Sequence, residues 1–241
     1  MPFGTIIKKQ QQRLSELNLV KDKLLSVISH DLRGPLHNLM GLISIHENGD
    51  LNSEETKNYI ATVNKEIKAT AGLLDDVLIW IKGQMKGITP NKVRFNLKEL
   101  AAKILVNNEN RAKEKNIELE VKGNEVEVYA DEEMVHLAIR NLVSNALKFA
   151  NPTNGKVYIE IKRTNNYGVC SVIDNGGGLS KNDLKLFEAG TSFTKQGTQQ
   201  EKGFGLGLLL TQEFLQHNNA ILEATNRKGL GAEFIIKIPL S

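Results

Sequence analysis

Apolar residues recur at alternating steps of three and four over two stretches near the start of the chain, and this spacing restricts the fold most. The first stretch covers residues 8–45 and the second runs from Ser53 to about residue 81. Such spacing places apolar side chains along one side of a helix. Ser53 with the acidic residues that follow it is typical of a helix start. We therefore expect two long helices joined near residues 46–53.

The two helices expose more apolar surface than one hairpin buries. Both are rich in leucine, isoleucine and valine around more than a narrow seam, so a second hairpin is needed to cover them. We expect an all-α helical hairpin over residues 1–88 that forms a homodimeric four-helix bundle. In this packing register His30 lies just beside the core, partly open to solvent.

The pattern of apolar residues changes after Pro90. Short alternating runs now separate helical ones, which is typical of an α+β sandwich with helices covering one face of a mixed sheet. We expect this second domain over residues 89–241, so the fold class is multidomain. The expected helices are Leu97–Arg111, Glu132–Phe149 and Leu206–His217, and the expected strands are Ile117–Val121, Glu125–Tyr129, Val157–Arg163, Tyr167–Ile173, Ala220–Thr225 and Ala232–Ile238.

Charge and hydropathy exclude two classes of partner. The net charge of +3 is too small to favour nucleic acid. No run approaches the roughly 18 apolar residues of a membrane span, so we expect no membrane contact within this chain. The lone cysteine, Cys170, forms no internal disulfide and is expected in the core. We expect a cytoplasmic protein, or the cytoplasmic part of a larger membrane-anchored or hybrid protein.

The first segment that carries a candidate reactive residue is Ser29–Leu36, which reads SHDLRGPL. A neutral imidazole such as that of His30 is a suitable nucleophile at physiological pH. The neighbouring carboxylate of Asp31 would hold the imidazole tautomer or accept the ring proton. An isolated histidine on a helix is more often a surface residue, so the interpretation depends on the rest of the chain.

Three further motifs follow along the chain. Residues 141–149 read NLVSNALKF, residues 174–178 read DNGGG after a strand, and residues 203–208 read GFGLGL at the start of a helix. Backbone amides at a helix N-terminus bind phosphates. The order of these motifs does not fit a Rossmann fingerprint, and the chain has no P-loop sequence. Each motif is a weak signal when taken alone.

Together and in this order, the four motifs resemble the phosphoacceptor, asparagine and glycine boxes of sensor histidine kinases. The resemblance spans residues 29–208 and implies a Bergerat (GHKL) ATP-binding domain after the helical hairpin. It further implies ATP-dependent autophosphorylation of His30, with Asp31 as general base or orienting group. The phosphoryl group would then pass to an aspartate in the receiver domain of a response regulator.

The resemblance also implies roles for single residues. Asn145 would bind Mg²⁺, Asn141 would lie near the metal and phosphates, and Lys148 would contact a phosphate. Asp174 would accept a hydrogen bond from the adenine amino group, beside Gly176 and Gly178. The polar run 194–202 would form a lid over ATP. The other implied nucleotide-binding residues are Phe149, Phe187, Gly203, Gly205, Leu206, Gly207 and Leu208.

Two other functions remain open at this stage. The related gyrase and Hsp90 domains hydrolyse ATP, but they place a glutamate where this chain has Asn141, so the general base for hydrolysis is missing. A scaffold that binds ATP without transferring it, or a dimerisation module, is the non-enzymatic alternative. Gly34 stands where many members of the family carry threonine or asparagine, so we expect weak phosphatase activity. The sensed signal, the cognate regulator and the choice between cis and trans phosphorylation are not encoded in these motifs.

Overall fold

The computed structural model describes residues 90–189, 198, 207–227 and 231–241, together with 37, 40–41, 43–44, 57, 59–64 and 67. The chain divides into two compact units, residues 1–85 and 86–241. The residues described in the first unit are all helical. The expected hairpin and dimeric bundle, along with His30 and Asp31, otherwise lie outside the described residues. Among the described residues, no helix is both long and apolar enough to cross a bilayer.

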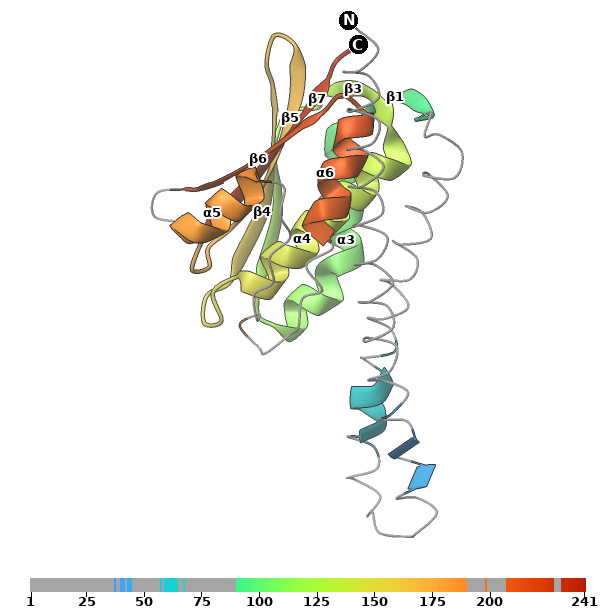
Figure 1. Cartoon of the computed structure of the whole chain (residues 1–241), viewed down its shortest axis with the longest axis vertical. Helices are drawn as coiled ribbons and strands as arrows, with labels where there is room; N and C mark the ends of the chain where they lie inside the picture. Colours follow the sequence, from blue (N-terminus) through green and yellow to red (C-terminus); the bar gives the residue numbers. More distant parts are fainter. Residues whose placement is uncertain are drawn as a thin grey trace, which may run out of the picture. The chain divides into compact units, whose positions relative to one another are not determined.

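The second unit is a two-layer α/β sandwich built on a mixed sheet (Figure 1). The strand order of the five-stranded sheet is β2-β4-β5-β7-β6, and only β2 and β4 run parallel. A separate two-stranded sheet pairs β1 with β3. The elements are β1 (Lys92–Asn96), α3 (Leu97–Glu114), β2 (Glu118–Gly123), β3 (Glu127–Asp131), α4 (Glu132–Phe149), β4 (Lys156–Arg163), β5 (Tyr167–Asp174), α5 (Lys181–Glu188), α6 (Gly207–His217), β6 (Ile221–Asn226) and β7 (Ala232–Pro239).

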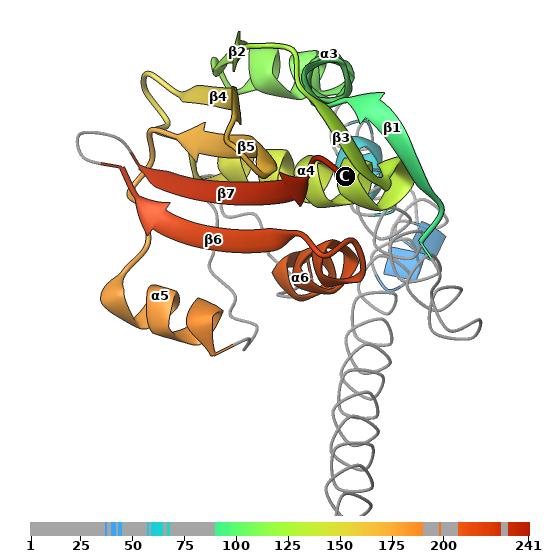
Figure 2. The same ribbon diagram turned by 90° about the horizontal axis from the view of Figure 1, so that it is seen from above.

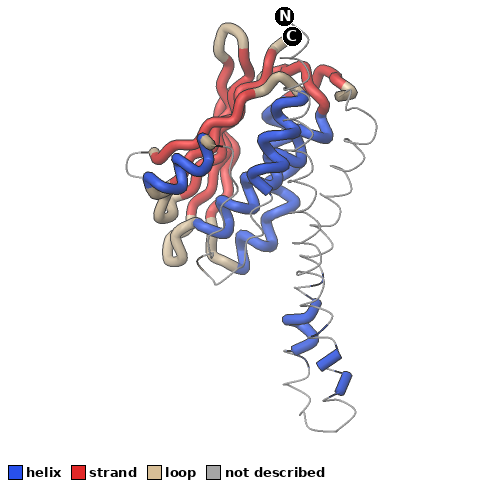
Figure 3. Tube along the Cα trace, viewed as in Figure 1, coloured by secondary structure: helices blue, strands red, loops and turns tan. Residues whose placement is uncertain are grey.

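Helices α3, α4 and α6 cover one face of the sheet, as Figures 2 and 3 show. Alternation along the strands explains which face they cover, because successive side chains point to opposite sides. In β4, Val157, Ile159 and Ile161 are fully buried under the helices, whereas Tyr158 and Glu160 face the other side and are only partly covered. The expectation of helices on one face of a mixed sheet is confirmed.

The face of the sheet opposite the helices carries polar side chains and several ion pairs. The carboxylate of Glu160 lies 2.8 Å from Lys162 and 3.4 Å from Arg227. The ring of Tyr158 lies between Lys122 at 4.6 Å and the same Arg227 at 5.9 Å. These charged and polar side chains suit a sheet face that is exposed to water.

Helix α4 is the central helix of the sandwich and carries the asparagine box. Asp131 caps its first turn by accepting the backbone N–H of Met134 at 3.0 Å, and Glu132 and Glu133 lie at its positive end. Its apolar side, including Ile139 and Leu142, is fully buried. The opposite side therefore remains available for polar residues.

Two elements were not expected from the sequence. Strand β1 is short, and its Val93 is 39% exposed, so it lacks a clear alternation of buried residues. Helix α5 begins with a capping box, in which Ser180 Oγ accepts the N–H of Asp183 and the Asp183 carboxylate accepts the N–H of Ser180. This Ser-x-x-Asp pattern is a sequence signal for a helix start.

Cys170 on β5 is fully buried, as expected, and burial raises the pKa of its thiol to about 12. The unfolded chain releases this proton near pH 8.5, whereas the folded chain keeps it. The thiol's contribution to the free energy of unfolding is therefore complete below about pH 8.5 and falls as pH rises from there towards 12.

We predict that between pH 8 and pH 10 the wild-type chain loses about 2 kcal/mol more unfolding free energy than the Cys170→Ala variant. Urea unfolding followed by circular dichroism at the two pH values measures both losses, and lysine and tyrosine titrations cancel in the comparison. Equal losses in the two proteins would contradict the burial argument.

Candidate functional site

The described part of the site centres on the carboxylate at the end of β5. Asp174 is 4% exposed, and its Oδ1 accepts the backbone N–H of Gly176 at 2.8 Å and of Ala232 at 3.3 Å. Burial raises the pKa of the Asp174 carboxyl, and these two amides oppose the rise by stabilising its charge. Among the described residues no protein group donates to the other oxygen, Oδ2. The carboxylate therefore has a fixed orientation and one oxygen left for a ligand.

The glycine loop after Asp174 approaches the end of α4 very closely. A β-carbon at Gly176 would collide with the carbonyl oxygen of Phe149, so a side chain has no room there. Gly178 has a φ of 71°, in the left-handed region that favours glycine. The loop is thus packed directly against the end of α4, beside Asp174.

Asparagines and a lysine of α4 occupy one side of the helix, because positions 141, 145 and 148 are four and three residues apart. The side chain of Asn141 donates to Thr211 Oγ1 at 2.8 Å, and this hydroxyl donates to the carbonyl of Gly207 at 2.8 Å. Asn145 lies one turn further along, half-buried. Asn141 therefore ties α4 to the first turn of α6, next to Asn145.

The C-terminal end of α4 contacts the segment that the sequence analysis interpreted as a lid. Lys148 is 7% exposed, and its Nζ lies 4.9 Å from the ring centroid of Phe149. The carbonyl of Lys148 accepts the N–H of Thr198 at 3.1 Å and its hydroxyl at 3.0 Å. Thr198, the one described residue of the 194–202 run, thus lies against the asparagine box.

Phe187 of α5 lies in the hydrophobic core. It is 7% exposed, and its ring meets that of Phe234 edge-on with centroids 6.0 Å apart. Gln212 of α6 donates to the carbonyl of Phe187 at 3.3 Å, which joins the two helices. A nucleotide contact by Phe187 therefore stays a prediction.

The second glycine box is described only at its end. Gly207 opens α6, and a β-carbon there would collide with the side chain of Asn141. Leu208 packs partly buried against the core. Gly203, Gly205 and Leu206 lie outside the described residues, as do His30 and Asp31. The structure thus brings together Asp174, the first glycine loop, the α4 box and the start of α6.

Several residues of this arrangement were not predicted as site residues from the sequence. Asn175 fastens the loop before β4, because its Oδ1 accepts the N–H of Lys156 at 2.8 Å and its Nδ2 donates to the carbonyl of Asn154 at 2.7 Å. Thr211 and Ala232 reach the site from positions far along the chain. An asparagine directly after the strand was a usable signal for a turn, whereas nothing local marks Thr211 or Ala232.

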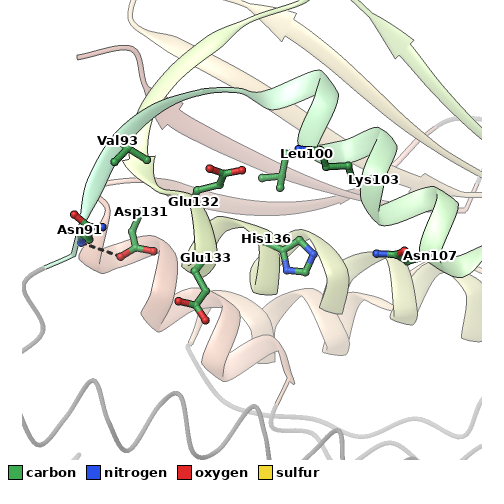
Figure 4. A pocket seen from close by; sticks show the side chains of 9 residues that line it. All are labelled: Asn91, Val93, Leu100, Lys103, Asn107, Asp131, Glu132, Glu133 and His136. Atoms are coloured by element: carbon green, nitrogen blue, oxygen red, sulfur yellow. Dashed lines mark hydrogen bonds between the residues drawn. The ribbon is translucent and has the colours of Figure 1, made fainter.

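A separate groove lies between β1, α3 and the first turns of α4 (Figure 4). Its volume is about 520 Å³, and no residue predicted for nucleotide binding lines it. Burial, and to a lesser degree the charge of Arg140, lowers the pKa of His136 in this groove. Within the described part of the chain no three His, Cys, Asp or Glu side chains converge on a metal position. The lining residues are Asn91, Val93, Leu100, Lys103, Asn107, Asp131, Glu132, Glu133 and His136.

Comparison with protein families gives two matches, in sequence order. Residues 20–82 match the family described as "His Kinase A (phospho-acceptor) domain". Residues 130–241 match the family described as "Histidine kinase-, DNA gyrase B-, and HSP90-like ATPase". The first match includes His30 and the second includes the whole site around Asp174.

Curated relatives of the chain are named as sensor kinases. The chain is 25% identical over 232 residues to the sensor histidine kinase GacS of Pseudomonas protegens, which covers 93% of this chain and 25% of that protein. It is 26% identical over 244 residues to the adaptive-response sensory kinase SasA of Crocosphaera subtropica, covering 97% of this chain and 63% of that one. The chain therefore spans about a quarter of the first relative and under two thirds of the second.

Solved structures share the fold. The histidine kinase AdeS of Acinetobacter baumannii aligns with a TM-score of 0.65 at 20% identity, over 88% of this chain and 98% of that one. The histidine kinase ThkA, solved in complex with the response regulator protein TrrA, aligns with a TM-score of 0.71 at 22% identity, over 97% and 65% of the two chains. A phospho-acceptor domain followed by this ATPase domain is the composition of a histidine kinase catalytic core, and the chain belongs to that family.

Proposed function

We propose that this chain transfers the γ-phosphoryl group of ATP to its own His30 and then passes it to a receiver-domain aspartate of a response regulator. The observation that carries the proposal is the buried Asp174 carboxylate, oriented by two backbone amides beside a glycine loop, in the domain that matches the ATPase family. The match of residues 20–82 to a phospho-acceptor domain supports His30 as the acceptor.

The geometry at Asp174 fits the amino group of adenine. A carboxylate only accepts hydrogen bonds, and the oxygen that the backbone leaves free suits one N–H donor. Guanine presents a carbonyl at the corresponding position and would meet the carboxylate acceptor to acceptor. Gly176 and Gly178 pack against Phe149 and Asn226, where a side chain has no room, so the backbone of the loop is held close beside Asp174.

The residues of α4 and α6 fit a metal-bound triphosphate. A side-chain amide oxygen at Asn145 is a suitable ligand for Mg²⁺, which shares its shell with phosphates and water. Asn141, Lys148 and Phe149 would line the phosphate path, together with Gly207 and Leu208 at the start of α6. Gly203, Gly205 and Leu206, which precede this helix in the sequence, would contribute as well. Bound Mg²⁺ would neutralise the charge that develops on the phosphoryl oxygens.

The nucleophile would come from the other domain. We propose that residues 1–88 form a phospho-acceptor hairpin that dimerises and that residues 89–241 bind ATP. Asp31 would orient the His30 imidazole or take its proton, so that the ring nitrogen attacks the γ-phosphorus in line. The connection 83–90 would act as a hinge that allows His30 to reach the nucleotide.

ATP hydrolysis is less well supported than phosphoryl transfer. The side chain of Asn141, at the position where the hydrolytic relatives place a glutamate, is an amide and donates a hydrogen bond to Thr211. An amide has no basic site that removes a proton from water. The chain thus lacks the general base of the hydrolases at that position.

Partners and location follow from the same proposal. ThkA was solved with a response regulator, which supports a receiver domain as the partner of this chain. We propose a homodimer in the cytoplasm, either as a cytoplasmic protein or as part of a larger one. Weak phosphatase activity towards the partner is expected because Gly34 carries no side chain that positions water.

Incubation with γ-labelled ATP and Mg²⁺ tests the proposed transfer. We predict that the label becomes attached to the chain through a phosphorus–nitrogen bond, which is lost in acid and survives alkali. The His30→Gln variant should bind ATP normally and take up no label, while the His37→Gln variant labels as the wild type does. Label that stays on the His30→Gln protein would refute the acceptor assignment.

Replacement of Asn145 by alanine tests the metal assignment. We predict a fall of roughly 100-fold or more in autophosphorylation rate, because the variant lacks a ligand of the Mg²⁺ that would stabilise negative charge on the phosphoryl oxygens. Binding of ATP in the presence of EDTA should be nearly unchanged. Asn107→Ala, an exposed asparagine of the separate groove, is the control and should retain the full rate. A parallel loss in EDTA would contradict a role through Mg²⁺.

The raised pKa of Asp174 predicts how ATP affinity depends on pH. Because burial raises this pKa, the carboxylate takes up a proton at a higher pH than an ordinary aspartate, and the protonated form loses its charge as acceptor. ATP affinity should therefore fall on acidification, beginning above the ordinary titration range of aspartate. Calorimetry from pH 8 to pH 5 measures this, and the Asp174→Asn variant should bind weakly with a flatter profile. Parallel profiles in the two proteins would show that another group titrates.

A further inference from the structure

The loop after Asp174 is held at its far end by a side chain from β6. Asn226 Oδ1 accepts the N–H of Leu179 at 2.7 Å, and Asn226 Nδ2 donates to the carbonyl of the same Leu179 at 2.7 Å. One amide side chain thus pairs with both backbone groups of one residue, as a neighbouring strand would. This pairing fixes the position at which the glycine loop leaves the site.

The near end of the loop is held from β7. Ala232 donates its N–H to Asp174 Oδ1 at 3.3 Å, and Gly231 donates its N–H to the carbonyl of Asp174 at 2.8 Å. Gly231 is packed so closely that a β-carbon there would collide with Asp174 Oδ1 and lie 2.5 Å from the nitrogen of Gly176. The orientation of the carboxylate therefore depends on the start of β7.

The hydrogen bonds at the two ends of the loop come from one pair of strands. Asn226 and Ala232 are direct partners in the antiparallel pairing of β6 with β7. The end of this strand pair therefore forms hydrogen bonds with both Leu179 and Asp174. Gly176 and Gly178 lie between these two residues in the sequence.

We propose that the paired end of β6 and β7 is the element that positions Asp174 to read the nucleotide base, and that Asn226 is its positioning residue. The inference rests on the proposed binding of ATP at Asp174. Asn226 acts through Leu179 and the glycine loop. It is an exposed side chain with two hydrogen bonds to one backbone residue, so its removal loosens the loop and leaves the core intact.

A merely structural role predicts a different outcome from a positioning role. Loss of folded protein would weaken every nucleotide equally. Misplacement of the carboxylate weakens only ligands that donate a hydrogen bond to it. Purine riboside triphosphate, which is ATP without its amino group, separates these cases because it keeps the ring, the ribose and the phosphates.

The experiment compares the affinities of the whole chain for ATP and for purine riboside triphosphate, both with Mg²⁺. In the wild type we expect ATP to bind roughly ten- to 100-fold more tightly, as a hydrogen bond to a charged group contributes. In Asn226→Ala this preference should fall by about fivefold, through weaker ATP binding at nearly constant analogue binding. Asn226→Asp keeps the acceptor for the Leu179 N–H and lacks the donor, so its preference should be intermediate.

Thr225→Ala, an exposed neighbour on the same strand, is the control and should keep the wild-type preference. Gly231→Ala is the second variant and should reduce the preference by displacing Asp174 Oδ1. An unchanged preference in Asn226→Ala, or equal weakening of both ligands, would overturn the inference while leaving the proposed function intact. A wild type that binds the two ligands equally would instead overturn base recognition by Asp174 itself.

Discussion

The site depends on one buried carboxylate whose charge is supported by backbone amides. A carboxylate that is 4% exposed is costly to keep ionised, and the N–H groups of Gly176 and Ala232 offset part of that cost at Asp174 Oδ1. Both amides bind the same oxygen, so the carboxylate is oriented as well as stabilised. The chain surrounding Asp174 must then stay in place, which explains why two segments distant in sequence converge on it.

Helix α4 connects the proposed base-binding end, at Asp174, to the proposed phosphate-binding end, at the start of α6. Its apolar side is fixed in the core by residues such as Leu142, while Asn141, Asn145 and Lys148 share the opposite side. The link from Asn141 through Thr211 to Gly207 places the first turn of α6 beside that side. Backbone amides at that turn, the asparagine box and the glycine loop thus surround one region, as nucleotide binding requires.

The sequence predicted those parts of the fold that depend on local patterns. The observed bounds of α4, Glu132–Phe149, agree with the prediction, because Asp131 with the two acidic residues after it marks the start and the apolar period marks the length. Helix α5 was missed although Ser180 and Asp183 form a capping box, since only eight residues follow and their periodicity is short. The sequence predicted a mixed sheet, whereas the order of its strands is known only from the structure.

The candidate site was predictable to the extent that its residues lie in recognisable motifs. Asp174, Gly176 and Asn141 were selected in this way, and the structure places Gly176 against Asp174 and Asn141 against the start of α6. Asn226, Thr211 and Ala232 were not, because their roles arise from contacts with residues about 47 to 70 positions away. No local pattern marks such contacts. The burial of Phe187 against Phe234 is likewise a tertiary result that the sequence motif did not indicate.

The central claim is that the adenine base is read at Asp174. A crystal structure of the chain with Mg²⁺ and a non-hydrolysable ATP analogue tests it most directly. We predict that the amino group of the base donates to Asp174 Oδ2 and that the triphosphate lies along Asn145 and the start of α6. A nucleotide bound elsewhere, for example in the groove beside His136, or a base that does not touch Asp174, would contradict the account.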